Sequence, residues 1–210
     1  STKAYTTQLA VLYLLTGRMA YVRGSFGETE AKSFASQLLL APEAMQQVLD
    51  RKEEIHYIAR SILNAKDVFM MGRGLDYSIL LEGSLKLKEI SYIHSEAYAS
   101  GELKHGTIAL ITEDTPVVAV VTQSKLQSKE FSNIKEVQSR GAGVILFMKE
   151  TFELDKEAAW ESVFQLPAME DSFMVMPASA ALQLLAYYVS LDKGLDVDKP
   201  RNLAKVVTVE

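Results

Sequence analysis

Residues 84–111 mix ionisable with apolar side chains: three lysines, three glutamates and two histidines stand among leucines, isoleucines and tyrosines. On a helix over residues 75–92, Glu82, Lys86 and Glu89 fall within a stripe roughly 60° wide. The other faces of this helix are mostly apolar, which is typical of a buried helix. The three charges must then be paired, wetted by a cleft or shifted in pKa. The pattern alone favours a simpler alternative, an ion-pair ladder on a solvent-facing edge.

A second ionisable cluster lies between two glycines, in the run Gly-Glu-Leu-Lys-His-Gly of residues 101–106. His105 in this run could move a proton near neutral pH. A histidine bonded to a backbone carbonyl is an equally good interpretation. His56 and His94 are better interpreted as structural, because one sits on the polar side of a helix and the other at a helix end. The spacing of the three histidines matches no metal motif, so we expect neither a metal nor a cofactor.

Two further segments could serve a reaction. The run Gly72-Arg73-Gly74 follows a buried strand, where backbone N–H groups can hold an anion, although a plain tight turn is slightly favoured. The last residues contain an apolar run around Lys205. Burial would lower the pKa of this lysine and free its amine to attack a carbonyl. An edge strand with a protective lysine is the more economical interpretation.

Strands and helices alternate after residue 65, and this alternation predicts a parallel sheet between two layers of helices. The expected strands are residues 68–71, 95–98, 117–121, 144–147 and 163–166, and the expected helices are residues 75–92, 102–109, 125–140 and 176–191. The tail from residue 196 is expected to be irregular.

The first part of the chain is expected to be helical. Helices are predicted over residues 6–22 and 28–40, and Pro42 is expected to start a third at its first turn. We therefore divide the chain into a helical part, residues 1–64, and an α/β part, residues 65–210. Because no initiator Met or strand precedes the first apolar helix, we expect the chain to be a piece of a longer one.

The composition narrows the class of protein. The chain has 210 residues, is 48% hydrophobic, contains no cysteine and has a net charge of −5. These values indicate a globular protein without disulfides and argue against a nucleic-acid partner, which requires a clustered basic face. We expect a cytoplasmic protein with no membrane partner.

Several blocks together resemble the isomerase half of the glucosamine-6-phosphate synthase family, which transfers glutamine-derived ammonia to fructose 6-phosphate. The matching segments are residues 1–8, 72–74, 81–94, 101–106 and 200–210. The resemblance implies a sugar isomerase (SIS) domain with a five-stranded parallel sheet, preceded by the helical remainder of a first SIS domain.

The resemblance also implies roles for particular residues. Lys205 would form an imine with the sugar C2, and Glu89 would move a proton between C1 and C2. His105 would assist ring opening from the partner copy of a homodimer, and Lys86 would support this charge network. The residues expected to bind the sugar are Ser1, Arg201, Ala204 and Lys205.

The implied partners are fructose 6-phosphate, glucosamine 6-phosphate and a glutaminase domain in the same full-length chain. The phosphate-binding loop and the glutaminase domain would both precede Ser1, so the fragment alone is expected to be inactive. Two alternatives stay open: a SIS sugar-phosphate isomerase or deglycase that uses no glutamine, and a non-catalytic sugar-phosphate sensor.

Overall fold

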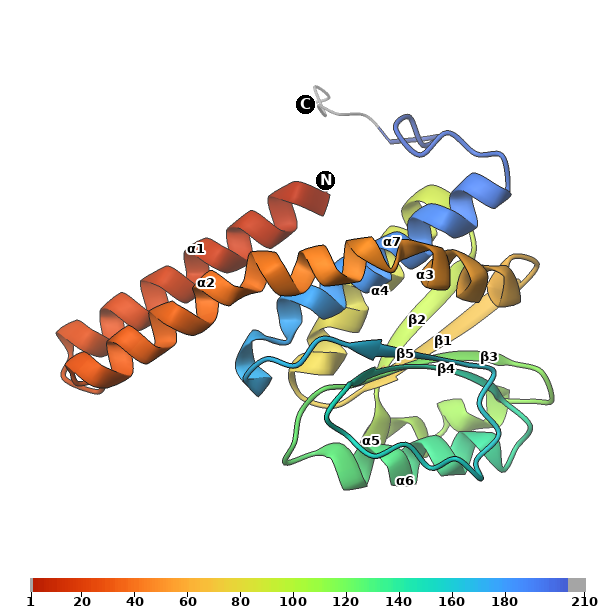
Figure 1. The fold of residues 1–210 in the computed structure, drawn as a ribbon. Helices are drawn as coiled ribbons and strands as arrows, with labels where there is room; N and C mark the ends of the chain where they lie inside the picture. Colours follow the sequence, from red (N-terminus) through yellow and green to blue (C-terminus); the bar gives the residue numbers. More distant parts are fainter. Residues whose placement is uncertain (1, 204–210) are drawn as a thin grey trace.

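The central element is one sheet of five parallel strands in the order β2-β1-β3-β4-β5. The strands are β1 Asp67–Gly72, β2 His94–Ala99, β3 Pro116–Val121, β4 Gly143–Lys149 and β5 Ser162–Leu166. The computed structural model describes residues 2–203. Figure 1 shows helices on both faces of this sheet, so the predicted three-layer α/β/α arrangement is confirmed.

Seven α-helices accompany the sheet in the described residues. They are α1 Thr2–Val22, α2 Glu28–Asp50, α3 Lys52–Ala59, α4 Leu75–Ser91, α5 Ser100–Leu103, α6 Gln127–Gln138 and α7 Val175–Asp192. Three short 3₁₀ turns are η1 Arg60–Ile62, η2 Thr107–Leu110 and η3 Asp171–Phe173. Helices α4 and α7 lie together on one face of the sheet, and α5 and α6 lie on the other (Figure 1).

Alternate strand residues divide the interior into two cores, because successive side chains of a strand point to opposite faces. Met70 and Val118 belong to the core shared with α2, α3, α4 and α7. Met71 and Ala119, one residue further along each strand, belong to the core beneath α6. Strands buried on both faces explain why β1, β3 and β4 read as continuous apolar runs.

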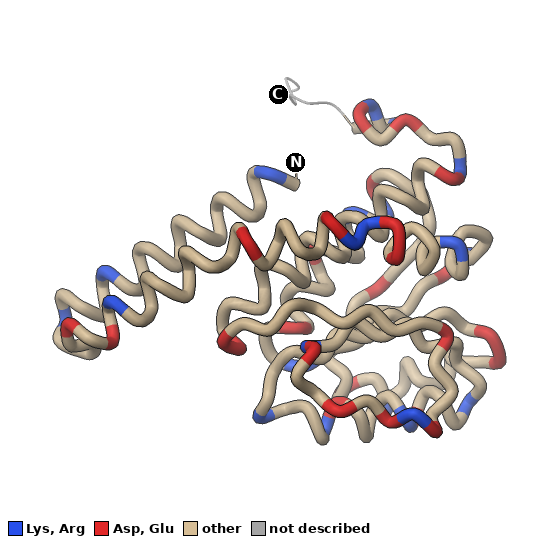
Figure 2. The backbone as a smooth tube through the Cα atoms, in the orientation of Figure 1, with Lys and Arg blue, Asp and Glu red and all other residues tan. Residues whose placement is uncertain are grey.

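Helices α1 and α2 form a long antiparallel pair that projects away from the sheet (Figure 1). Residues 4–17 of α1 carry no charge, as the tan stretch in Figure 2 shows. Leu12, Leu14 and Met19 are nevertheless more than half exposed. The pair is attached to the rest of the protein through Tyr13 and Phe34, whose rings lie 5.1 and 5.0 Å from that of Phe173.

Residues 171–192, comprising η3 and α7, are long and apolar enough to cross a membrane by length and composition alone. In the structure, 78% of the apolar window in this segment is buried inside the protein. Helix α7 packs against α2, α3 and α4. It thus fills the interior of one helical layer.

The prediction that Pro42 starts a new helix is wrong, because α2 runs through it from Glu28 to Asp50. A proline inside a helix removes one backbone hydrogen bond and costs about 3 kcal/mol. Ala41, Ala44 and Val48 are buried beside it. Their packing in the main core outweighs the local preference, and the helical path breaks at Arg51 instead.

The predicted helix over residues 102–109 is also corrected. Helix α5 ends at Leu103, and the separate turn η2 begins at Thr107. Between them Gly106 has a φ of 154°, which a side chain would rarely allow. Helix α5 has already ended at Leu103, and this glycine separates His105 from the turn η2.

Candidate functional site

The charged stripe of α4 is a compact ion cluster with Lys86 at its centre. The Lys86 Nζ lies 2.5 Å from Oε2 of Glu89 and 3.6 Å from Oε1 of Glu82. The Lys86 side chain is only 9% exposed, whereas that of Glu89 is 28% exposed. The i, i+4 and i, i+3 ion pairs of the expected ladder are both present, but the lysine at their centre does not face solvent. A buried ammonium holds a carboxylate that keeps access to solvent.

Glu89 borders a groove of about 490 Å³ between the end of α4 and the tail that follows α7. The lining residues are Leu85, Lys88, Glu89, Tyr92, Ile93, His94, Arg201, Asn202 and Leu203. Segments far apart in the sequence thus meet around one carboxylate. The groove joins Glu89 to the last described residues of the chain.

Tyr92 connects these two walls. Its hydroxyl accepts a hydrogen bond of 2.8 Å from the backbone N–H of Arg201. The Arg201 guanidinium carbon also lies 4.1 Å from the centre of the Tyr92 ring, a cation–π distance. Tyr92 ends α4 in a left-handed conformation, with a φ of 60°.

His105 lies apart from this groove. It follows α5, beyond the carboxyl end of β2, and its side chain is exposed. Glu89 sits near the end of α4, beside His94 at the start of β2. No hydrogen bond or ion pair joins Glu89 to His105 among residues 2–203. One copy of the chain therefore does not bring the two groups together.

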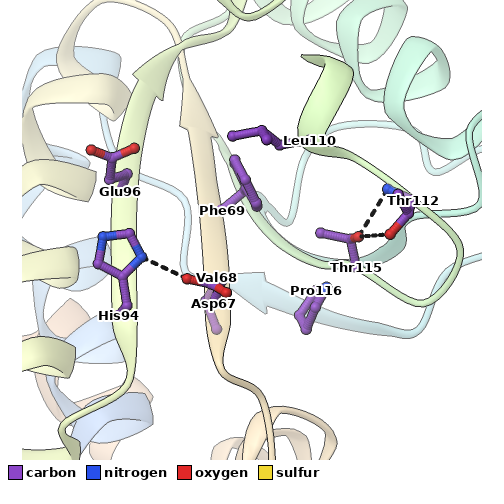
Figure 3. Close-up of a pocket in the computed structure, with 9 residues that line it drawn as sticks. All are labelled: Asp67, Val68, Phe69, His94, Glu96, Leu110, Thr112, Thr115 and Pro116. Atoms are coloured by element: carbon purple, nitrogen blue, oxygen red, sulfur yellow. Dashed lines mark hydrogen bonds and ion pairs between the residues drawn. The ribbon is translucent and has the colours of Figure 1, made fainter. Parts of the chain in front are cut away.

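His94 also borders a second cleft of about 430 Å³ at the amino-terminal edge of the sheet (Figure 3). Its Nδ1 lies 2.7 Å from Oδ1 of Asp67, and both side chains are more than half exposed. Phe69 and Leu110 give this cleft an apolar wall. An exposed pair of this kind contributes little to stability. His56, by contrast, stacks on Tyr188 at 4.3 Å and contacts Asp192 at 2.8 Å, so its ring is used in packing.

At the carboxyl edge of the sheet, the glycine turn after β1 holds Arg73 against the neighbouring helix α6. The Arg73 guanidinium donates to Oδ1 of Asn133 at 2.7 and 3.1 Å. Its Nε also lies 3.7 Å from Oε2 of Glu130. The arginine side chain is thus used within the protein.

Two buried acids lie next to this turn. Burial raises the pKa of Glu130 to about 7, and the charge of Asp76 adds to the shift. Burial also raises the pKa of Asp76 to about 6, although hydrogen bonds from Thr122 oppose the shift. Oε1 of Glu130 accepts from Ser100 at 2.6 Å, while Oε2 has no hydrogen-bond partner among the described residues.

A third acid, Asp171, is bonded to the loop that follows β3. It accepts from the Ser124 backbone N–H at 2.6 Å, the Ser124 hydroxyl at 2.8 Å and the Lys149 ammonium at 2.9 Å. Burial opposes ionisation, but these donors keep the pKa of Asp171 below its ordinary value. Asp171 lines a crevice of about 700 Å³ at the carboxyl edge of the sheet, where open α/β sheets bind ligands.

Three of the predicted site residues, Ser1, Ala204 and Lys205, lie outside the described residues. Among the others, the structure brings Lys86, Glu89 and Arg201 to the groove or its charge cluster. Tyr92 was not predicted as a site residue, since only its i, i+3 spacing from Glu89 could have pointed to the groove. Asp76, Glu130 and Asp171 were missed because their partners are more than 20 residues away in the sequence.

Comparison with known proteins identifies the family to which this fold belongs. The profile of the SIS domain family matches residues 61–191, which is more than half of the chain. The chain belongs to the SIS domain family. Over all 210 residues, this SIS protein is 51% identical to the glutamine–fructose-6-phosphate aminotransferase [isomerizing] of Caldanaerobacter subterraneus subsp. tengcongensis. It is 50% identical to the enzyme of the same name from Clostridium acetobutylicum.

A solved structure agrees with these relatives. The C-terminal domain of glucosamine-fructose-6-phosphate aminotransferase from Francisella tularensis superposes with a TM-score of 0.90 and 39% sequence identity. The match covers 95% of this chain and 56% of that one. The predicted similarity to the isomerase region of this enzyme family is confirmed. The SIS chain spans 34% of the length of the two curated relatives.

Proposed function

We propose that this chain supplies the isomerase part of an enzyme that makes glucosamine 6-phosphate from fructose 6-phosphate and glutamine-derived ammonia. The observation that carries the proposal is the position of Glu89. Its partly exposed carboxylate is held by buried Lys86 and faces residues 201–203, only a few residues before Lys205. A carboxylate near an amine is the arrangement that imine-based isomerisation requires.

The chemistry follows from these groups. The Lys205 amine adds to the C2 carbonyl of the open ketose and water leaves, which gives an iminium. Ammonia then displaces the lysine from C2. Glu89 removes a proton from C1 and returns one to C2, while the C1 hydroxyl proton is lost and the nitrogen gains one. The product is the aldose with an amine at C2. General acid–base catalysis of this kind contributes about 10²- to 10⁴-fold to a rate.

His105 enters this scheme from a second copy. Within one copy it follows the carboxyl end of β2, whereas Glu89 lies beside the start of that strand. An exposed imidazole on a glycine-bounded loop is free to reach a neighbouring molecule. The proposed active form is therefore a homodimer, in which each site combines Glu89 of one copy with His105 of the other.

The rest of the full-length enzyme completes the proposal. The relatives are about three times as long as this chain, which leaves room for a glutaminase domain and for the residues that hold the sugar phosphate. Without them, the 210-residue chain is expected to be inactive and to bind fructose 6-phosphate poorly. A substrate that is a phosphorylated sugar also favours a cytoplasmic enzyme.

Subunit mixing of the full-length enzyme tests the shared site. Glu89→Gln and His105→Ala homodimers should each be inactive, because every site lacks one group. Random mixing gives half heterodimers with one intact site each, so about a quarter of the wild-type activity should return. No recovery would contradict a site shared between copies.

A matched control and a second measurement separate the alternatives. Glu82→Gln changes the other carboxylate beside Lys86, which does not line the groove, and should retain most activity. Borohydride should trap fructose 6-phosphate on Lys205 in the wild type. Binding without a trapped adduct would favour a sensor over an enzyme. Turnover of the sugar without any use of glutamine would favour a plain isomerase or deglycase.

A further inference from the structure

The backbone of Tyr92 has a conformation that tyrosine rarely adopts. Its φ of 60° and ψ of 17° place it in the left-handed region at the end of α4, where glycine or asparagine is usual. A non-glycine residue in this region bears a steric cost, and such residues cluster at functional sites. The side chain of Tyr92 therefore needs an explanation beyond ending the helix.

Its two contacts both reach one residue of the tail. The hydroxyl accepts from the Arg201 backbone N–H at 2.8 Å, and the ring faces the Arg201 guanidinium at 4.1 Å. These contacts join positions that are 109 residues apart. One holds the backbone and the other the side chain, so together they fix both the place and the direction of the tail at this point.

The contact lies beside the proposed catalytic carboxylate. Glu89 and Tyr92 are three residues apart and line the same groove, with Arg201–Leu203 opposite. Lys205 follows Arg201 by four residues, and these span at most about 14 Å when fully extended. Without the contact, the nearest backbone bond to the rest of the fold would be that of Leu195, whose N–H donates to the Ser190 carbonyl at 3.0 Å, ten residues before Lys205.

We propose that Tyr92 is a positioning residue that anchors Arg201 and so keeps the Lys205 amine close to Glu89. This inference rests on the proposed function, since it assigns a purpose to holding Lys205 there. Moving the last fixed point from ten residues before Lys205 to four raises the local concentration of that position about fourfold by chain-closure statistics. Tyr92 thus acts on the reaction through the tail, without contact with the sugar.

Two variants of the full-length enzyme separate the contributions of the Tyr92 ring, its hydroxyl and its backbone conformation. Tyr92→Asn keeps a residue that tolerates the left-handed conformation and removes both contacts. Tyr92→Phe removes the acceptor oxygen and keeps the ring beneath Arg201. Tyr57→Phe is the matched control, because Tyr57 lies on α3 and is 71% exposed.

The expected losses of kcat and of trapping rate differ in size among the three variants. Tyr92→Asn should lower kcat and the rate of borohydride trapping on Lys205 about fourfold, with an unchanged KM for fructose 6-phosphate. Tyr92→Phe should fall between this variant and the wild type, and Tyr57→Phe should match the wild type. Hydrogen exchange of the Arg201 amide should become faster in both Tyr92 variants.

The failures are distinguishable. If exchange at Arg201 rises but trapping on Lys205 keeps its wild-type rate, Tyr92 holds the tail without serving the reaction, and the inference is overturned. If the exchange rate does not change, the anchor itself is refuted. If the wild type traps no sugar on Lys205, the proposed function fails and the inference fails with it, whatever the exchange data show.

Discussion

Glu130 offers a direct test of the electrostatics at the carboxyl edge of the sheet. Its folded pKa of about 7 lies above the ordinary value of 4.5, mainly because of burial. A raised acid pKa means that the folded state binds more protons than the unfolded state, so stability falls as pH rises between these two values. For a shift of this size, the free energy of unfolding should lose about 2 to 3 kcal/mol between pH 5 and pH 8 on account of this one group.

The variant Glu130→Gln removes the ionisation and keeps the shape. At pH 5 the wild-type side chain is largely protonated, so the variant should have nearly the wild-type stability. At pH 8 it should be more stable than the wild type by about 2 to 3 kcal/mol. Urea unfolding followed by far-UV circular dichroism at pH 5, 6.5 and 8 measures the difference.

Glu43→Gln on α2 is the matched control, because it makes the same chemical change at an exposed helical position. The pH dependence of Glu130→Gln is read as its difference from this control. A stability difference that stays constant from pH 5 to pH 8 would refute the raised pKa, and lower stability of Glu130→Gln at pH 8 would show that the Arg73 charge outweighs burial.

Three other predictions can be checked with the same unfolding measurements. Lys86→Met should destabilise the protein by about 2 kcal/mol, because it leaves the carboxylates of Glu82 and Glu89 without their cation. Unchanged stability would show that this ion cluster is only a surface feature. Gly83→Ala should destabilise by about 1 kcal/mol despite better helix propensity, because its Cβ would lie 2.8 Å from Leu182 in the α4–α7 contact; a higher urea midpoint would refute this packing. Asp171→Asn should be less stable at pH 7, since a lowered pKa contributes stability above the ordinary carboxyl pKa, and the difference should shrink as pH falls through the folded value; a difference that grows on acidification would contradict the lowered pKa.

The sheet could be predicted from the sequence because its signals are local. Strands buried on both faces, such as β1 and β4, are continuous apolar runs between glycines and polar residues, and period-2 burial follows from the geometry of a strand. The charged stripe of α4 could be found for the same reason, since helical spacing alone aligns it.

The features that escaped prediction depend on contacts between distant segments. Helix α2 tolerates Pro42 because its neighbours are buried in the main core, which no local preference reveals. The raised pKa values of Asp76 and Glu130 arise where the ends of three strands meet. The left-handed conformation of Tyr92 is likewise connected with Arg201, which lies far away in the sequence.

The carboxylate of Asp171 has a consequence for anything that enters the crevice at the carboxyl edge of the sheet. Its partners, an N–H group, a hydroxyl and an ammonium, would equally suit an oxygen of a phosphate. Because the chain tethers the Asp171 carboxylate, it competes for these donors at an effective concentration of about millimolar or above and cannot diffuse away. An anionic ligand would have to displace the Asp171 carboxylate from these donors as well as make its own contacts. The crevice therefore favours neutral or cationic ligands.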